Sequence, residues 1–325
     1  MKAENNAWIK YSYIAIATII GVFLGIVSNN VYHGYTKTET NNFPQELHEG
    51  GYKHISPLLS CSDFNDASEH EIENKLTDSI NRSIKNGKIT YASVYFRDLN
   101  NGPWIGINES EEFTPASLLK VPLMIAYLKI AENYPTVLDE ELLIVDNSDT
   151  LSQNIIPLRT VENGKSYKVS DLIEYMIVYS DNKAANTLLS HIDVESLNAV
   201  YEDLGIKTPD VNDSENFMSV RDYASFFRIL YNASYLNREM SEKALSILTN
   251  SQFNLGLSAG VPPQIDVAHK FGERVLLEGK QLHDCGIIYK VDKPYLLCIM
   301  TRGTNFIGMG ETIKTISETV YNEFD

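Results

Sequence analysis

The chain has 325 residues, enough for one large folded domain and additional segments. Hydrophobic residues make up 43% and charged residues 22%, proportions that are ordinary for a globular protein and exclude a wholly disordered chain. The 27 Lys and Arg against 43 Asp and Glu give a net charge of -16, which excludes nucleic acid as an expected partner because its phosphates would be repelled.

Near the N-terminus, residues 11–28 (YSYIAIATIIGVFLGIVS) form an uncharged run just long enough for a transmembrane helix. The run does not end in the small residues of a signal-peptide cleavage site, which favours a retained anchor. Lys2 and Lys10 precede it and the next basic residue is Lys37, so the positive-inside rule makes residues 1–10 a cytoplasmic tail. We therefore predict a single-pass protein of the cell membrane whose remaining chain is extracytoplasmic.

A polar stretch follows the apolar run. Residues 29–68 are rich in Asn, Gly, Thr, Ser and His and show no sustained apolar period, which predicts a stalk. Residues 69–325 are predicted to form the folded domain. Its first helix is expected at 69–86, where apolar residues recur at helical spacing. These residues are Ile72, Leu76, Ile80 and Ile84.

Strand patterns occur at both ends of the predicted domain. Residues 89–99 and 104–109 are β-rich and are joined by strong turn residues, which predicts a hairpin. Residues 285–289 and 295–300 form a second strand pair, and a final helix is expected at 311–324.

The middle of the domain, residues 117–250, shows several helical patterns and little strand character. The two ends are therefore expected to build one antiparallel sheet flanked by helices, and the middle an all-helical subdomain. The predicted fold class is α+β.

The chain has three cysteines, Cys61, Cys285 and Cys298, none of them in a C-x-x-C pair or at metal-ligand spacing with a histidine. No metal and no cofactor is predicted. Cys285 and Cys298 can sit on adjacent strands, which leaves a disulfide open, but buried free thiols are the commoner state of such a pair.

One candidate for nucleophilic chemistry lies at the start of a predicted helix. Ser117-Leu118-Leu119-Lys120 opens an apolar helical segment, and residues three apart share a helix face, so Lys120 is expected to reach the Ser117 hydroxyl. A neutral amine can take the proton of a serine hydroxyl, and a helix N-terminus favours developing negative charge. Taken alone, however, S-x-x-K is a frequent pattern on solvated helix faces.

Two further groups follow in order. Ser180-Asp181-Asn182 comes after an apolar helical stretch, and Lys270-Phe271-Gly272 precedes the second strand pair. Each has an ordinary explanation, as a helix cap, a surface charge or a bulge.

The joint order of the three groups resembles the class A β-lactamases and penicillin-binding peptidases, whose signatures are S-x-x-K, S-D-N and K-T-G. The first two signatures match, and the third is altered to Lys270-Phe271-Gly272. The resemblance covers residues 69–325. It implies the β-lactamase/transpeptidase-like fold and an acyl-enzyme mechanism.

Carried over by position, the resemblance implies that Ser117 attacks a carbonyl with Lys120 as general base. Ser180 would relay the proton to the leaving nitrogen, and Lys270 would supply positive charge near Ser180 and a substrate carboxylate.

For substrate binding, the resemblance implies that Asn182 holds an amide side chain of the substrate. Gly272 would allow close approach of the strand backbone, and the N–H groups of Ser117 and Glu273 would form the oxyanion hole, with Glu273 acting only through its backbone. Asp181 would support its loop through backbone hydrogen bonds.

Two departures separate the sequence from the class A pattern. Phe271 replaces the hydroxyl residue expected at a substrate carboxylate, and Arg302 is a candidate replacement cation or, equally, a surface arginine paired with an acidic neighbour. The E-x-x-L-N of the deacylating loop is absent and the loop is shortened. Its remaining acids, Asp210, Asp213 and Glu215, are more often solvated than catalytic.

The resemblance thus implies a serine hydrolase that forms an acyl-enzyme on Ser117 with a β-lactam or a peptidoglycan stem peptide. Alternatives are a D-Ala-D-Ala peptidase, a penicillin-binding sensor whose adduct persists, and a pseudoenzyme, which ranks last. The oligomeric state is left open.

Overall fold

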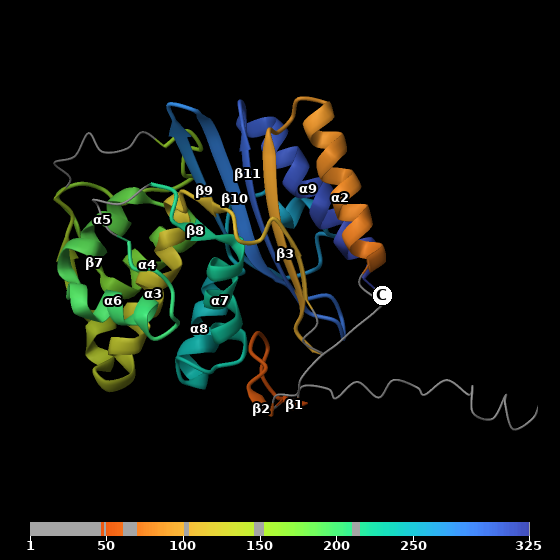
Figure 1. The fold of residues 1–325 in the computed structure, drawn as a ribbon. Helices are drawn as coiled ribbons and strands as arrows, with labels where there is room; N and C mark the ends of the chain where they lie inside the picture. Colours follow the sequence, from red (N-terminus) through yellow and green to blue (C-terminus); the bar gives the residue numbers. More distant parts are fainter. Residues whose placement is uncertain are drawn as a thin grey trace, which may run out of the picture. The chain divides into compact units, whose positions relative to one another are not determined.

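The computed structural model describes residues 47–48, 50–60, 70–100, 104–145, 153–209 and 215–324. From residue 47 onward this described part forms one compact unit, in which a central sheet is covered by two long helices on one face and a helical subdomain on the other (Figure 1). This is the predicted α+β architecture.

The central sheet has five antiparallel strands in the order β4-β3-β11-β10-β9. Their bounds are Tyr91–Asp98 for β3, Trp104–Ile107 for β4, Val267–Leu276 for β9, Gly279–Ile288 for β10 and Tyr295–Gly303 for β11. Both predicted strand pairs are present. Since β9 is an edge strand, one side of its backbone remains available to a neighbouring element.

Helices α2 (His70–Lys85) and α9 (Phe306–Glu323) cover one face of the sheet (Figure 1). Leu76 of α2 and Ile313 of α9 are fully buried in the cluster that includes the strand residue Phe96. The apolar stripe read from the sequence of α2 therefore forms one side of this core.

The helical subdomain covers the other face. Its helices are α3 (Lys120–Asn133), α4 (Val169–Val178), α5 (Asn182–His191), α6 (Val194–Glu202), α7 (Val220–Tyr231) and α8 (Arg238–Leu248). Short 3₁₀ turns lie at Ala116–Leu119 (η1), Pro135–Asp139 (η2) and Leu257–Gly260 (η3). Two-stranded pairs join β5 (Glu112–Phe113) to β8 (Met218–Ser219) and β6 (Glu141–Leu143) to β7 (Ser166–Lys168).

Helix α3 is the buried centre of this subdomain. Every residue from Lys120 to Leu128 is buried, so the helix is enclosed all round rather than on one face. Helix α7 contacts β3, β10 and β11 of the sheet. The element that begins beside Ser117 is therefore held rigidly within the core.

The segment 50–60 packs on the domain and does not extend away from it. The Glu242 carboxylate of α8 accepts hydrogen bonds from the backbone N–H groups of His54 and Ile55 and also contacts His54 Nδ1 at 2.7 Å. Ile55 is buried in the core, and Ser56 N–H donates to Tyr231 O. The stalk prediction is therefore wrong for residues 50–60, because a buried isoleucine and a long-range carboxylate fix this segment. Strands β1 (Leu47–His48) and β2 (Leu58–Ser60) pair here.

No helix in the described part of the chain combines the length and the apolar character needed to cross a bilayer. The predicted anchor, residues 11–28, lies outside the described residues, and it stays a prediction.

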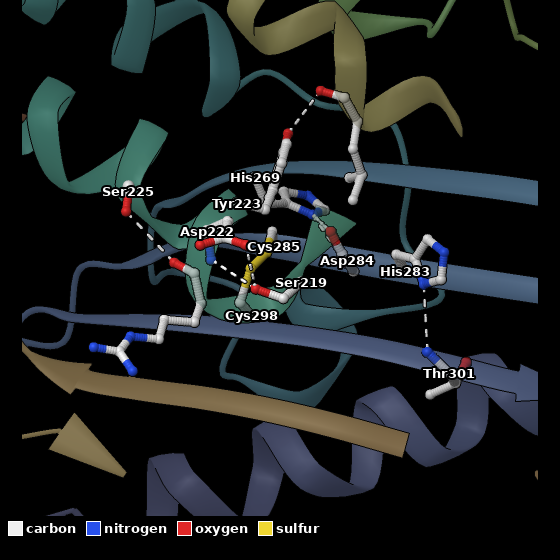
Figure 2. The surroundings of a disulfide bond; sticks show 12 residues. Ser219, Asp222, Tyr223, Ser225, His269, His283, Asp284, Cys285, Cys298 and Thr301 are labelled. Carbon is white, nitrogen blue, oxygen red and sulfur yellow. Dashed lines mark hydrogen bonds and ion pairs between the residues drawn. A yellow bond between two sulfur atoms is a disulfide. The ribbon is translucent and has the colours of Figure 1, made fainter. Parts of the chain in front are cut away.

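Cys285 and Cys298 face each other directly across β10 and β11, with Cα atoms 4.1 Å apart, and are joined as a disulfide (Figure 2). The preference for free thiols is therefore wrong. The strand register places the two side chains on the same face of the sheet at opposite positions, which brings their Cβ atoms close. Lys270 is the register partner of Cys285 on the next strand.

Alkylation tests this pairing. In denaturant without reductant, iodoacetamide should add one group per chain, at Cys61, and after reduction it should add three, one for each cysteine of the sequence. Intact mass gives the count directly. Three added groups before reduction would show that Cys285 and Cys298 are free.

Candidate active site

Ser117 lies in η1 at the head of α3, and the residue before it is conformationally strained. Ala116 has φ +50°, a left-handed conformation that costs energy for a residue with a Cβ. Tyr223 of α7 donates a hydrogen bond from its hydroxyl to Leu118 O at 2.9 Å, in the buried layer (Figure 2). Ser117 itself is half-buried. Packing from α7 thus holds a strained turn that presents the Ser117 hydroxyl.

The edge strand β9 approaches this turn at Gly272. A Cβ on Gly272 would lie 2.6 Å from Pro115 O and 3.1 Å from Leu118 N. Any larger residue would therefore force β9 away from η1. Glycine at this position lets the strand backbone run alongside the turn that carries Ser117.

Lys120 is buried, and its ammonium group is directed at the loop before α5. Its Nζ donates to Ser180 O at 2.6 Å, to Asn182 Oδ1 at 2.7 Å and to Ser180 Oγ at 3.3 Å. The Ser117 hydroxyl makes no hydrogen bond to any other described residue, so the expected Ser117–Lys120 hydrogen bond is not formed here.

Burial lowers the pKa of Lys120 to about 7, against the opposing charges of Asp181 and Glu273. A substantial fraction of Lys120 is therefore neutral near neutral pH. A neutral amine of this kind can act as a proton acceptor.

Lys270 reaches the same serine from the opposite side. Its Nζ donates to Ser180 Oγ at 2.8 Å and to Phe271 O at 2.9 Å, and the side chain is fully buried. Burial lowers the pKa of Lys270 well below its ordinary value, and the charge of Lys120 lowers it further, while Asp284 opposes the shift. Ser180 has φ +57° and lies between the two amines.

Asp181 organises the loop that carries Ser180. Its carboxylate accepts from Lys183 N–H at 2.8 Å, capping α5, and from Val161 N–H at 2.7 Å. This is the backbone-supporting role expected from the sequence. Gln153 adds a hydrogen bond from Nε2 to Ser180 O at 2.9 Å. The main chain at residue 180 is thus fixed from several sides.

The Glu273 side chain has contacts that the sequence did not indicate. Its carboxylate accepts from Asn154 N–H at 2.6 Å, Ile155 N–H at 2.8 Å and Asn154 Nδ2 at 2.9 Å. The expected backbone role of Glu273 in the oxyanion hole stays a prediction, and these side-chain contacts are additional to it. The Glu273 carboxylate therefore connects β9 to the segment 154–155 by hydrogen bonds.

Residues 74–324 match the model of the β-lactamase enzyme family. The chain belongs to this family.

Solved structures share its fold. PBP-A, in an L158E mutant described as an acyl-enzyme complex with penicillin G, is 23% identical with a TM-score of 0.66, covering 78% of this chain and 96% of that one. A β-lactamase from Xanthomonas campestris pv. campestris is 20% identical with a TM-score of 0.67, covering 78% and 99%. The TLA-3 extended-spectrum β-lactamase is 18% identical with a TM-score of 0.67, again covering 78% and 99%. No curated protein matches the sequence.

Arg302 of this β-lactamase-family chain is engaged by the segment 111–113. Its Nη1 pairs with Glu111 Oε1 at 2.7 Å and its Nη2 donates to Glu112 O at 2.7 Å. Its guanidinium also stacks 4.4 Å from the centre of the Phe113 ring. Arg302 is therefore paired with an acidic neighbour, which is one of the two alternatives expected from the sequence, and its use as a substitute cation stays a prediction.

A buried polar network, which no sequence motif indicated, holds the segment before Ser117. His283 Nε2 donates to Thr114 O at 3.0 Å, and its Nδ1 accepts from Thr301 N–H at 3.3 Å. Burial lowers the pKa of His283 to about 3, so the ring is neutral and carries its proton on Nε2. Gln281 and Asn216 extend the network to Thr114 N–H and Oγ1. Gln281 and His283 flank the apolar Leu282, a short alternation typical of a strand, which gave no indication of this network.

Among the candidate deacylating acids, Asp210 and Asp213 lie outside the described residues. Glu215 is exposed, and its Oε1 pairs with Arg274 Nη2 at 3.1 Å. Its carboxylate is engaged by an arginine, which disfavours its use as a base for a hydrolytic water.

We expect Glu215→Gln to leave the loss of an acyl adduct unchanged for this reason. The measurement is the rate at which the adduct disappears from the intact mass after excess ligand is removed. A variant that loses its adduct much more slowly than the wild type would assign water activation to Glu215.

Proposed function

We propose that this chain is a serine hydrolase that forms an acyl-enzyme on Ser117 with β-lactams or peptidoglycan-like amides. The observation that carries the proposal is the position of Ser180 Oγ, 3.3 Å from Lys120 Nζ and 2.8 Å from Lys270 Nζ. Two buried amines on one hydroxyl form a proton route beside the strained turn of Ser117. Family membership and the acyl-enzyme reported for PBP-A support the same chemistry.

The proposed reaction begins with attack of Ser117 Oγ on the carbonyl carbon. The hydroxyl proton passes to neutral Lys120, and the negative charge on the tetrahedral oxygen is stabilised by the backbone N–H groups of Ser117 and Glu273. The carbon–nitrogen bond then breaks while Ser180 gives its proton to the leaving nitrogen. Ser180 recovers a proton from Lys120, so Lys120 is neutral again and the net change is the transfer of one proton from Ser117 to the leaving nitrogen.

A second candidate is a penicillin-binding peptidase or sensor whose acyl-enzyme persists. The engagement of Glu215 by Arg274 favours it, because this is the one candidate deacylating acid among the described residues. In this variant of the proposal the acylation chemistry is unchanged, and only the hydrolytic step is slow.

We also propose that residues 11–28 anchor the protein in the cell membrane with residues 69–325 outside the cytoplasm. The proposal is supported by the uncharged run and by the basic residues that precede it. Release of the full chain from membranes by alkaline carbonate would contradict it.

A time course of intact mass tests the acyl-enzyme. The protein is incubated with benzylpenicillin or its methyl ester, and an adduct of the ligand's mass is expected on the wild type. Ser117→Ala should abolish the adduct, whereas Ser110→Ala, at an exposed serine, should keep it. An adduct that forms equally on Ser117→Ala would show that the nucleophile is misassigned. Turnover of the ligand would identify a β-lactamase, and a lasting adduct a penicillin-binding protein.

A further inference from the structure

Thr114 lies shortly before Ser117, and its N–H, carbonyl and hydroxyl groups are all hydrogen-bonded. The residue is 7% exposed. Its N–H donates to Gln281 Oε1 and its hydroxyl donates to Asn216 Oδ1, both at 3.0 Å. Its carbonyl oxygen accepts from His283 Nε2 at 3.0 Å. A buried residue bonded in this way is held in one position, because a shift would leave several polar groups without partners at once.

The His283 ring is bonded to the main chain at both of its nitrogens. Thr114 O can only accept a hydrogen bond, so Nε2 carries the proton, and Nδ1 accepts from Thr301 N–H at 3.3 Å (Figure 2). The side chain is fully buried. An apolar residue could fill the same space in the core, but it could not fix the Thr114 carbonyl. The imidazole therefore determines where this carbonyl lies.

The strand register brings His283 next to the turn of Ser117. His283 on β10 is the partner of Gly272 on β9, and cross-strand partners project from the same face of a sheet. The space that a side chain on Gly272 would need is occupied by Pro115 O and by Leu118 of η1. His283 and η1 thus meet on one face of the sheet.

The chain between Thr114 and Ser117 has little freedom to adjust. It consists of Pro115 and Ala116. The ring of Pro115 fixes its φ, which is -66°, and Ala116 has the left-handed φ of +50°. A displacement of Thr114 is therefore passed on to Ser117 and is not absorbed between them.

From these contacts we propose that His283 is a positioning residue for Ser117, which holds the Thr114 carbonyl and so places the Ser117 hydroxyl for attack. Gln281 supports the same segment through Thr114 N–H. Within the described part of the chain, neither side chain hydrogen-bonds to Ser117 or Lys120, so both act through position alone. The inference rests on the proposed acyl-enzyme and adds no chemical step to it.

Two variants of similar length separate the hydrogen bond from packing. His283→Gln keeps an N–H donor near the place of Nε2, whereas His283→Met has none. With saturating benzylpenicillin, His283→Met should be acylated about a hundredfold more slowly than the wild type, the effect of a displacement of about 1 Å at a reacting group. His283→Gln should regain most of this rate. The dissociation constant of the noncovalent complex, obtained from the dependence of the rate on ligand concentration, should not change.

Ser317→Ala is the matched control, because it also removes a buried donor from a main-chain carbonyl. The Ser317 hydroxyl donates to Leu257 O at 2.9 Å, and the residue lies fully buried on α9, at the other face of the sheet. Urea unfolding should show lower stability in this variant and in His283→Met, but Ser317→Ala should keep the wild-type acylation rate. An equal loss of rate in both variants would show that stability, and not position, limits acylation.

Gln281→Met tests the same segment should His283→Met fail to fold. It removes the acceptor of Thr114 N–H, and it should lower the saturating acylation rate without changing the dissociation constant. A wild-type rate in this variant would contradict the positioning of Ser117 through Thr114.

A neutral fluorophosphonate separates failure of this inference from failure of the proposed function. It should label Ser117 in the wild type and not in Ser117→Ala. Equal penicillin acylation of the wild type and of His283→Met would overturn the positioning role and leave the nucleophile in place. No labelling and no adduct on the wild type would overturn the acyl-enzyme proposal and this inference with it.

Discussion

Lys120→Met should reduce the rate of acylation of Ser117 by about a thousandfold, the scale of a lost general base. Methionine fills a similar volume but cannot accept the proton of the Ser117 hydroxyl. The buried amine of Lys120 has a pKa lowered to about 7 and a hydrogen bond to Ser180, and Lys120 begins the helix that follows directly on the turn of Ser117. The measurement is the rate of adduct formation by intact mass, with a methyl ester and with a free acid as ligands.

The pH profile of the wild type provides the mechanistic check. Burial lowers the pKa of Lys120 to about 7. The neutral form is the base, so acylation should increase with pH through about 7 and level off above it. Lys120→Met should show a much lower acylation rate and no inflection near this pH.

Lys129→Met is the matched control. Lys129 lies on the same helix, where it pairs with Glu132 and donates to Tyr235 O, and it has no contact with the serine cluster. Acylation should proceed at the wild-type rate. A large loss in this variant, or full activity in Lys120→Met, would contradict the assignment of Lys120 as the base.

Gly272→Ala should lower acylation by about a hundredfold, the scale of a lost oxyanion donor. The added Cβ would lie 2.6 Å from Pro115 O, so β9 and η1 must separate. The backbone N–H of the next residue, Glu273, moves with the strand and no longer complements the oxyanion. The separation should also cost about 1 to 3 kcal/mol of stability, as overpacking in a core does.

Two measurements separate the two expected effects of Gly272→Ala, the displaced oxyanion donor and the lower stability. Acylation rates report the displaced donor, and urea unfolding reports the overpacking. Gly50→Ala is the control, because a Cβ there has no neighbour within 4 Å and should change neither quantity. Unchanged acylation in Gly272→Ala would show that the strand backbone does not contribute to the oxyanion site.

Patterns of neighbouring residues were sufficient to predict the α+β architecture and to select the candidate site residues. Apolar periodicity identified α2, and turn residues between β-rich runs identified the hairpin of β3 and β4. These signals are local, since each is produced by residues a few positions apart. The order of the S-x-x-K and S-D-N groups likewise needs only the chain itself.

Long-range contacts decided which groups surround the candidate residues. Spacing placed Lys120 and Ser117 on one helix face, but Ser180 and Asn182, some sixty positions further on, supply the acceptors that hold the amine. The position of the segment 50–60 likewise could not be predicted from neighbouring residues, because the partner that fixes it is Glu242 of α8.

The sequence by itself predicted the α+β fold and contained the ordered serine and lysine groups that resemble those of the β-lactamase family. Only the tertiary structure decided that Arg302 pairs with Glu111, that Glu273 ties β9 to Asn154, and that Cys285 meets Cys298. The physical reason is that the patterns that predict helices and strands are formed by residues a few positions apart in the sequence. A hydrogen bond or ion pair depends on which distant strand or loop the folded core brings within about 3 Å.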